Sequence, residues 1–194
     1  TNASGARSFK YGATRDFVER LRIVIPDGDV IEIRRGQYVG EGETLTVRTE
    51  SGREIAFKLP TYDRPDVRKN VSGLFNGRPF DVIDLFIGSE GTLGVVAEIE
   101  LRLLEKPKGF FSGIVFFEKN SDLLVFVDEA KARSFSNFRS EIRDHFGASL
   151  VEYFDANALK FISEKFPETP SNMAGAIFFE QETTAANEDD LLSA

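Results

Sequence analysis

The sequence predicts an α+β protein whose two halves are built from different patterns. Alternating apolar and polar residues dominate residues 1–106 and predict antiparallel strands and hairpins. Residues 107–194 instead combine Phe-rich strands with helical periodicity. Lys106-Pro107-Lys108-Gly109 lies between the two patterns, so the predicted domains are residues 1–106 and 107–194.

Two hairpins are predicted in the first half. Residues 21–33 alternate on both sides of Pro26-Asp27-Gly28-Asp29, whose composition is typical of a turn. Residues 45–59 repeat this arrangement around Glu50-Ser51-Gly52-Arg53. Both stretches therefore favour pairs of adjacent antiparallel strands.

The hairpins are followed by a loop, a short helix and a strand. Residues 60–80 contain several prolines and glycines and no periodicity, which predicts a long loop of the kind that is often functional. Asp81 can cap a short helix that Gly88 closes. Strict alternation over residues 95–103 then predicts a half-buried strand.

Beyond the boundary, the expected order is strand, helices, strand, helix, strand. Residues 110–118 are apolar and predict a buried strand, and residues 174–180 predict another. Ser121 and Asp155 can each cap a helix. The i, i+4, i+8 spacing of Phe138, Ile142 and Phe146 predicts one face of a further helix, which Gly147 can end. In the helix after Asp155, one face is predicted to contain Leu159, Ile162 and Phe166.

Composition excludes several kinds of site. The chain has no cysteine, which removes disulfides and thiolate chemistry, and one histidine, so we expect no metal site. A net charge of −8 argues against a nucleic-acid partner. No apolar run reaches the ~18 residues of a membrane span, and the first residues do not form a signal peptide, so we expect no transmembrane anchor and a cytoplasmic location.

The run from Leu85 to Val96 carries the clearest functional signal. Its glycines, Gly88, Gly91 and Gly94, recur every three residues between a helix and a strand. Because glycine lacks a Cβ, such a loop lets backbone amides approach a bulky anionic ligand. The nicotinamide-type glycine motif requires the opposite order, strand then helix, and is excluded. A purely structural alternative is that the glycines turn the chain into an edge strand.

Further motifs join this loop in a recognisable order. Thr1-Asn2-Ala3-Ser4-Gly5-Ala6-Arg7 and Lys10-Tyr11-Gly12-Ala13-Thr14-Arg15-Asp16 precede the first hairpin, and Arg68-Lys69-Asn70-Val71-Ser72-Gly73 and Asp84 to Val96 follow it. This combination resembles the FAD-linked oxidase and dehydrogenase family. The family includes the glycolate oxidase flavoprotein subunit, D-lactate and D-2-hydroxyglutarate dehydrogenases, and alkyl-dihydroxyacetonephosphate synthase.

The resemblance covers residues 1 to about 105 well and the remainder loosely. It implies that residues 1–106 are the second lobe, the C-terminal part, of a FAD-binding domain of the vanillyl-alcohol oxidase and p-cresol methylhydroxylase type. Residues 107–194 would then begin an α+β cap domain that carries the substrate. We therefore expect a fragment of a longer polypeptide, with the glycine-rich pyrophosphate loop upstream and a His-rich segment downstream.

The same resemblance implies the site residues. FAD would contact two groups of positions: Thr1, Asn2, Ala3, Ser4, Gly5, Tyr11 and Gly12, and Glu90, Gly91, Thr92, Leu93, Gly94, Val95 and Val96. Arg68 and Ser72 would form the catalytic, substrate side of the flavin, where a guanidinium grips a carboxylate bidentately. The alternative for Arg68 is a solvent-exposed loop arginine. The family usually has Asn-Thr-Gly-Tyr or Asn-Ala-Gly-Tyr where this chain has Asn70-Val71-Ser72-Gly73-Leu74.

The expected activity is oxidation of a small 2-hydroxy acid of the glycolate or D-lactate type, with FAD as cofactor and an unidentified electron acceptor. Three alternatives stay open. The chain could belong to an enzyme like alkyl-dihydroxyacetonephosphate synthase, be a half-domain that is inert in isolation, or be an interaction module that reuses the fold without FAD.

Overall fold

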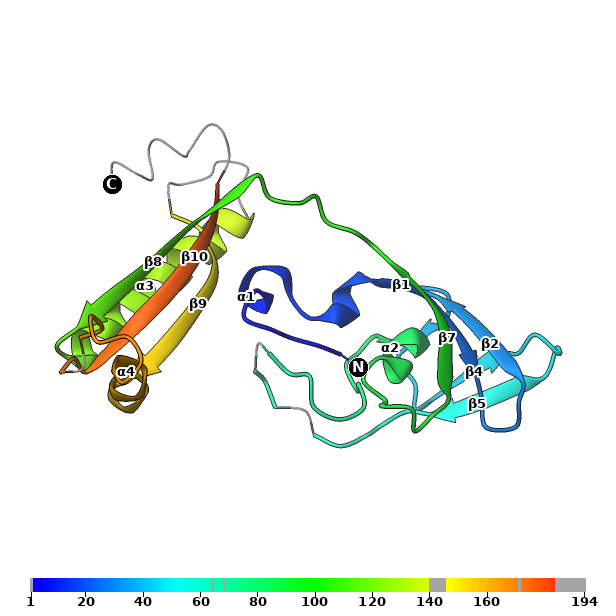
Figure 1. Cartoon of the computed structure of the whole chain (residues 1–194). Helices are drawn as coiled ribbons and strands as arrows, with labels where there is room; N and C mark the ends of the chain where they lie inside the picture. The colour runs from blue at the N-terminus through cyan, green and yellow to red at the C-terminus, as the bar shows by residue number, and fades with distance from the viewer. Residues whose placement is uncertain (1, 64, 68, 140–145, 171, 184–194) are drawn as a thin grey trace. The chain divides into compact units, whose positions relative to one another are not determined.

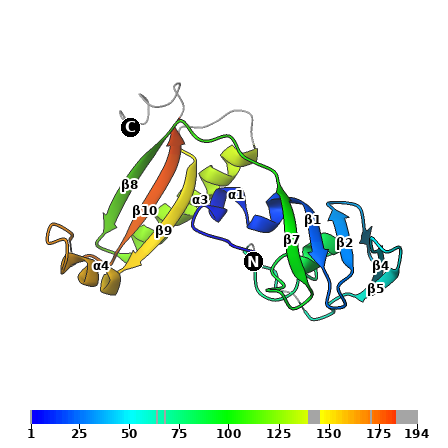
Figure 2. The ribbon, with the colours of Figure 1, turned by 45° about the vertical axis from the view of Figure 1, so that its right-hand side comes forward.

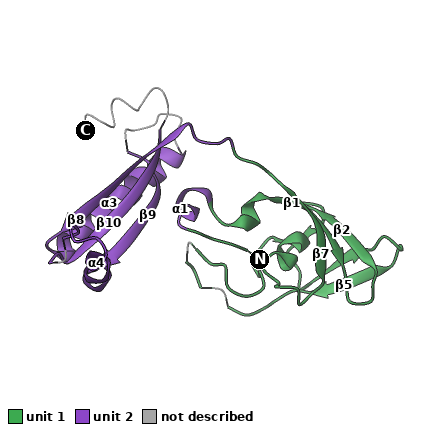
Figure 3. Cartoon of the chain, in the orientation of Figure 1, with its two compact units in different colours: residues 1–5, 12–104 green, residues 6–11, 105–194 purple. Residues whose placement is uncertain are grey.

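The computed structural model describes residues 2–63, 65–67, 69–139, 146–170 and 172–183, and it divides the chain into two units (Figures 1 and 3). Unit 1 comprises residues 1–5 and 12–104, and unit 2 comprises residues 6–11 and 105–194. The sequence did not predict that residues 6–11 would join unit 2. The identification of the two units with a FAD-binding domain and a cap domain stays a proposal.

Unit 1 is built from antiparallel strands. A three-stranded sheet has the order β2-β1-β7, with β1 at Val18–Val24, β2 at Val30–Arg34 and β7 at Val95–Leu101 (Figure 2). Two smaller sheets pair β4 (Thr44–Arg48) with β5 (Glu54–Lys58) and β3 (Val39–Gly40) with β6 (Phe80–Asp81). The β1–β2 and β4–β5 pairs confirm both predicted hairpins.

The helix before the glycine loop is central to unit 1. In α2 (Val82–Phe86) every residue is buried, and the Asp81 carboxylate accepts a hydrogen bond from the Ile83 amide (3.3 Å), as the predicted N-cap requires. The core gathers apolar side chains of β1, β2 and α2 together with Val47, Leu59 and Phe80. A short 3₁₀ helix, η1 (Thr14–Phe17), leads into β1. The described part of residues 60–79 contains no helix or strand, which confirms the predicted loop except at Phe80, where β6 begins.

Strand β7 corrects one expectation. Its alternation predicted a half-buried strand, but every residue of β7 is exposed, with Val95 at 68% and Ile99 at 56%. β7 is an edge strand that pairs with β1, and the buried core of unit 1 lies over β1, β2 and α2. Alternation therefore identified the strand, while burial depends on neighbours that a sequence pattern does not contain.

Unit 2 contains a sheet of order β8-β10-β9, with β8 at Gly109–Phe117, β9 at Ala148–Asp155 and β10 at Gly175–Thr183. The helices are α1 (Ser8–Tyr11), α3 (Asn120–Arg139) and α4 (Ala156–Ser163). The strands and helices follow the predicted order, except that the structure describes one helix, α3, between β8 and β9 where more than one was expected. Asp155 caps α4 through the Ala158 amide at 2.7 Å. Among the described residues, no helix has the length and apolar character needed to cross a bilayer.

Four details of unit 2 differ from expectation. Ser121, the predicted cap, lies inside α3, which begins at Asn120. β8 alternates between half-buried and exposed residues and is not fully buried, because it lies at the edge of its sheet. A single helix, α3, runs to Arg139; residues 140–145 lie outside the described residues, and Phe146 lies outside any helix. Phe166 lies beyond the end of α4.

The N-terminal segment Ala6–Tyr11 is held in unit 2 by charge and aromatic contacts. Arg7 donates two hydrogen bonds to Glu180, at 2.8 and 3.1 Å, and Lys10 and Tyr11 both contact the carboxylate of Glu182. The rings of Phe9 and Phe135 stack with centroids 5.0 Å apart. The two glutamates that alternate on β10 are therefore partners of this segment.

Acid should weaken the turn of unit 1 that contains Asp29. The Asp29 carboxylate accepts hydrogen bonds from the Ser51 hydroxyl (2.6 Å) and the Val30 amide (2.8 Å), and the Ser51 contact is the main cause that holds the pKa of Asp29 below its ordinary value. A depressed carboxyl pKa adds stability that is present above the unfolded value of about 3.9 and is lost as the pH falls through the folded-state pKa.

We expect Asp29→Asn to have a lower melting temperature than the parent at pH 7. The difference should shrink as the pH falls below about 4, because the Asp29 carboxyl of the unfolded parent then takes up a proton that the folded carboxylate accepts only at lower pH. Thermal melts between pH 7 and pH 2 measure this difference. A constant difference across that range would show that the charge of Asp29 plays no part.

Candidate functional site

The loop between α2 and β7 has a backbone conformation that residues other than glycine rarely adopt. The backbone φ is positive at Gly88 (90°), Glu90 (54°), Gly91 (81°) and Gly94 (154°), and Glu90 is the one non-glycine residue with this property in the described part of the chain. Ser89 and Thr92 close a tight turn, since the Thr92 amide (3.0 Å) and hydroxyl (2.6 Å) both donate to the Ser89 carbonyl. Positive φ at both central residues is typical of type I′ turns. Non-glycine residues in this region store strain, which is frequent at functional sites.

The three glycines of the loop serve different purposes. A Cβ on Gly94 would lie 2.8 Å from both Ile23 Cγ2 and the Val24 carbonyl oxygen, so the loop must pass directly against β1. A Cβ on Gly88 would lie 3.3 Å from the Cβ of Asn2. A Cβ on Gly91 would meet nothing within 4 Å. Close packing therefore accounts for Gly88 and Gly94, a reason other than the sharp turn into an edge strand that the structural alternative gave, whereas a Cβ on Gly91 would face open space.

The first residues of the chain lie against this loop. The Asn2 Oδ1 accepts a hydrogen bond from the Arg15 amide (3.0 Å), and the Ala3 carbonyl accepts from the amide and the hydroxyl of Thr14, each at 3.0 Å. The Oγ of Ser4 is buried and has no hydrogen-bond partner among the described residues. Thr1 lies outside the described residues. The N-terminal motif and the glycine loop thus meet at Asn2 and Gly88.

A buried charge cluster holds the start of the loop. The guanidinium of Arg15 donates to Asp84 Oδ1 (3.0 Å), and Arg35 Nη1 lies 2.8 Å from the same oxygen and 3.8 Å from Asp81 Oδ2. Burial is the main cause that lowers the pKa of Arg15. The pairing of two arginines with two aspartates balances the charges locally. Sequence reasoning missed this cluster because its members are far apart in the chain and follow no periodic pattern.

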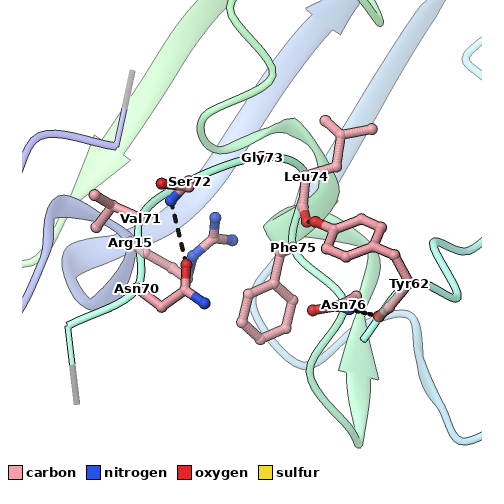
Figure 4. A pocket seen from close by; sticks show the side chains of 9 residues that line it. All are labelled: Arg15, Tyr62, Asn70, Val71, Ser72, Gly73, Leu74, Phe75 and Asn76. Carbon is pink, nitrogen blue, oxygen red and sulfur yellow. Dashed lines mark hydrogen bonds between the residues drawn. The ribbon is translucent and has the colours of Figure 1, made fainter. Parts of the chain in front are cut away.

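The structure describes only some of the residues predicted to lie on the substrate side of the flavin. A cavity of about 20 Å³ is lined by Arg15, Tyr62 and residues 70–76, which is room for about one water (Figure 4). Ser72 is exposed, and its amide donates to Asn70 Oδ1 at 3.3 Å (Figure 4). Arg68 lies outside the described residues. The assignment of Arg68 and Ser72 to the substrate therefore stays a prediction.

The structure brings some predicted cofactor residues together and separates others. Asn2 to Gly5 and Glu90 to Val96 belong to unit 1, whereas Tyr11 belongs to unit 2, where its hydroxyl contacts Glu182. Gly12 has a positive φ of 81° and starts a turn in which Asp16 Oδ2 accepts from the Ala13 amide (2.9 Å). A structural role accounts for both Tyr11 and Gly12, and their assignment to the cofactor stays a prediction.

The residues that meet at Asn2 and Gly88 fit a bulky anionic cofactor. Ser4 offers a buried hydroxyl without a partner, and a Cβ on Gly5 would meet no atom within 4 Å. In the described part of the chain, the amides of Glu90 and Gly91 donate to no backbone or side-chain acceptor. Backbone amides at successive positions of a turn form a nest for anions. The site thus presents amide and hydroxyl donors that no described acceptor uses, and the charged side chain of this turn is the carboxylate of Glu90.

Curated relatives of the chain are dehydrogenases and oxidases of hydroxy acids. A D-lactate dehydrogenase of Anaerostipes hadrus is 30% identical over 129 residues, which is 66% of this chain and 20% of that protein. The glycolate oxidase subunit GlcD of Bacillus subtilis is 33% identical over 107 residues, or 55% of this chain and 15% of that one. A D-2-hydroxyglutarate dehydrogenase of Xanthomonas citri is 28% identical over 171 residues, or 88% of this chain and 26% of that one. No protein-family model matches the chain.

Among solved structures, an alkyldihydroxyacetonephosphate synthase aligns with 100% of this chain and 29% of its own, with a TM-score of 0.56 and 14% identity. This likeness confirms a mixed α+β fold with antiparallel sheets that aligns with part of the synthase. The chain spans between 15% and 26% of the length of the three curated relatives. Over that part of their length, it is a distant homologue of FAD-linked D-lactate dehydrogenase, glycolate oxidase and D-2-hydroxyglutarate dehydrogenase.

Proposed function

We propose that the chain is part of a FAD-dependent oxidoreductase that oxidises a small 2-hydroxy acid of the glycolate or D-lactate type. Unit 1 would be the C-terminal part of its FAD-binding domain, and unit 2 the first part of its cap domain. The observation that carries the proposal is the meeting of the N-terminal motif with the glycine loop at Asn2 and Gly88, beside the unpartnered Ser4 hydroxyl. The substrates for which the curated relatives are named, D-lactate, glycolate and D-2-hydroxyglutarate, support the substrate class.

Two parts of unit 1 would hold the cofactor. The hydroxyl of Ser4 and the amides of Glu90 and Gly91 would donate hydrogen bonds to acceptor atoms of FAD, and the open space at Gly5 and Gly91 would admit it. FAD, when bound, supplies the two-electron acceptor for the oxidation. The strain at Glu90 is consistent with a turn that is set for binding.

The substrate would lie on the side of the flavin that faces Arg68 and Ser72. A guanidinium is suited to this role because its planar fork matches a carboxylate with two parallel hydrogen bonds. Arg68 would bind the carboxylate of the hydroxy acid, and Ser72 would add a hydroxyl beside it. The electron acceptor that reoxidises the flavin is unidentified.

The activity is tested with the full-length protein that contains this chain, purified with its flavin. Anaerobic addition of glycolate or D-lactate should bleach the flavin absorbance, because the oxidation of the acid reduces the cofactor. A flavin that no 2-hydroxy acid bleaches would contradict the substrate class and favour the alkyl-transfer alternative. A purified protein without FAD that cannot be reconstituted would contradict the cofactor itself.

A further inference from the structure

Arg15 connects three segments of unit 1 that are distant in the sequence. Its backbone amide donates to Asn2 Oδ1 in the N-terminal motif (3.0 Å). Its guanidinium donates to the carbonyl oxygens of Asp84 (2.5 Å) and Ile87 (2.6 Å), directly before Gly88. The guanidinium also lies over the ring of Phe75, 4.5 Å from the centroid, in the loop that lines the cavity of Figure 4.

These contacts give the Arg15 side chain a structural role within unit 1. Its exposed fraction is 13%, and both terminal nitrogens donate to atoms of unit 1. The carbonyls of Asp84 and Ile87 belong to the last turn of α2 and the residue after it, where helical carbonyls lack intrahelical partners. Arg15 thus fixes the end of the helix from which the glycine loop starts.

We propose that Arg15 is the positioning residue of the site: it sets the glycine loop against the N-terminal motif and thereby determines FAD affinity. This inference rests on the proposed function for its link to FAD, but its effect on the loop is independent of any cofactor. A lysine cannot replace the arginine, because a single ammonium lacks the planar fork that reaches a carboxylate and two carbonyls together.

Arg35 offers a matched control in the same cluster. Its Nη1 lies 2.8 Å from Asp84 Oδ1, the oxygen to which Arg15 also donates, and its side chain is 30% exposed. Its side chain donates to the carbonyls of Val18 (3.2 Å) and Arg15 (2.9 Å), and no hydrogen bond in the described part of the chain joins it to Ile87 or Phe75. Arg35→Lys therefore disturbs the charge cluster without releasing the start of the glycine loop.

The first measurement is amide hydrogen exchange on the flavin-free chain. Arg15→Lys should speed exchange at Ser89 and Thr92, whose amides close the loop turns, by at least about tenfold, which equals about 1.4 kcal/mol. The amide of Thr49 in the β4–β5 hairpin should be unaffected. Arg35→Lys should change the loop amides by less than about threefold.

The second measurement uses the full-length protein reconstituted with FAD. Arg15→Lys should weaken FAD binding about tenfold and alter the visible spectrum of the bound flavin at saturation, whereas Arg35→Lys should leave the spectrum unchanged. General destabilisation lowers the fraction that binds but does not change the spectrum of bound flavin. If Arg15→Lys does not fold, Asn2→Ala, which removes one link to Arg15, should show the same local exchange and a smaller loss of affinity.

The outcomes separate the two proposals. Loop exchange that is unchanged in Arg15→Lys, or changed equally in Arg35→Lys, would overturn the positioning role. The expected local exchange in Arg15→Lys, together with a parent protein that never binds FAD, would have two consequences. It would support the role of Arg15 in positioning the loop, and it would reject the proposed FAD function.

Discussion

Replacement of Gly94 by alanine is expected to lower the free energy of unfolding of unit 1 by about 2–4 kcal/mol. The new Cβ would lie 2.8 Å from the Val24 carbonyl oxygen, which is backbone of β1 and cannot rotate away. It would also lie 2.8 Å from Ile23 Cγ2 in the core, at a φ of 154° that favours glycine. Native-state hydrogen exchange of the β1 amides measures the loss within unit 1.

Gly91→Ala is the matched control for this prediction. Gly91 also has a positive φ, 81°, but a Cβ there meets no atom within 4 Å. Its replacement should therefore cost about 1 kcal/mol, the strain of the backbone alone. Equal losses for the two variants would show that close packing against β1 is not what requires Gly94.

Replacement of Asp84 by alanine is expected to destabilise unit 1 by about 3–5 kcal/mol. The Asp84 side chain is 10% exposed, and its Oδ1 lies within 3.0 Å of both Arg15 and Arg35. Its removal leaves two guanidinium groups partly buried without that carboxylate, which is far less favourable than the loss of an exposed ion pair. Urea denaturation together with exchange of the α2 amides measures the effect.

Glu98→Ala on β7 is the control for Asp84→Ala. Glu98 also pairs with two arginines, Arg20 and Arg22, but its side chain is 48% exposed. Water solvates the arginines once the carboxylate is gone, so the loss should be much smaller than for Asp84 and should shrink further at high salt. A loss as large as that of Asp84→Ala would contradict the role given to burial.

Local chemistry made most of the strands and helices predictable. The turn Pro26-Asp27-Gly28-Asp29 and the cap at Asp81 act over a few residues, so their patterns predicted β1–β2 and α2 correctly. The exposure of β7 was not predictable in this way, since burial is set by what packs over a strand. The join of residues 6–11 to unit 2 depends on partners such as Glu180, more than 170 residues away in the chain.

The sequence likewise predicted some features of the candidate site and missed others. The glycine spacing marked the loop, and the resemblance paired it with the N-terminal motif, whose Asn2 lies against Gly88. The cluster of Arg15, Arg35 and Asp84 gave no signal, because isolated charges in a sequence do not reveal which of them share a buried site. Only the folded structure shows which of these charges, distant in the sequence, form pairs.

FAD binding by the 194-residue chain alone should be weak, since under the proposed function its motifs would supply one wall of the cofactor site. Calorimetric titration with FAD should give no tight complex. Tight binding would contradict the expectation that further parts of a longer protein complete the site.

Mapping of FAD-induced amide shifts on the isolated chain by NMR tests the proposed cofactor wall most directly, because it detects weak complexes residue by residue. At millimolar FAD, the shifts should concentrate at Asn2 to Gly5 and Glu90 to Val96. They should weaken in Ser4→Ala, which lacks the unpartnered hydroxyl, and persist in Ser51→Ala, whose hydroxyl bonds to Asp29 far from the loop in sequence. Shifts that are absent from both segments, or that gather on unit 2, would contradict the proposed cofactor site.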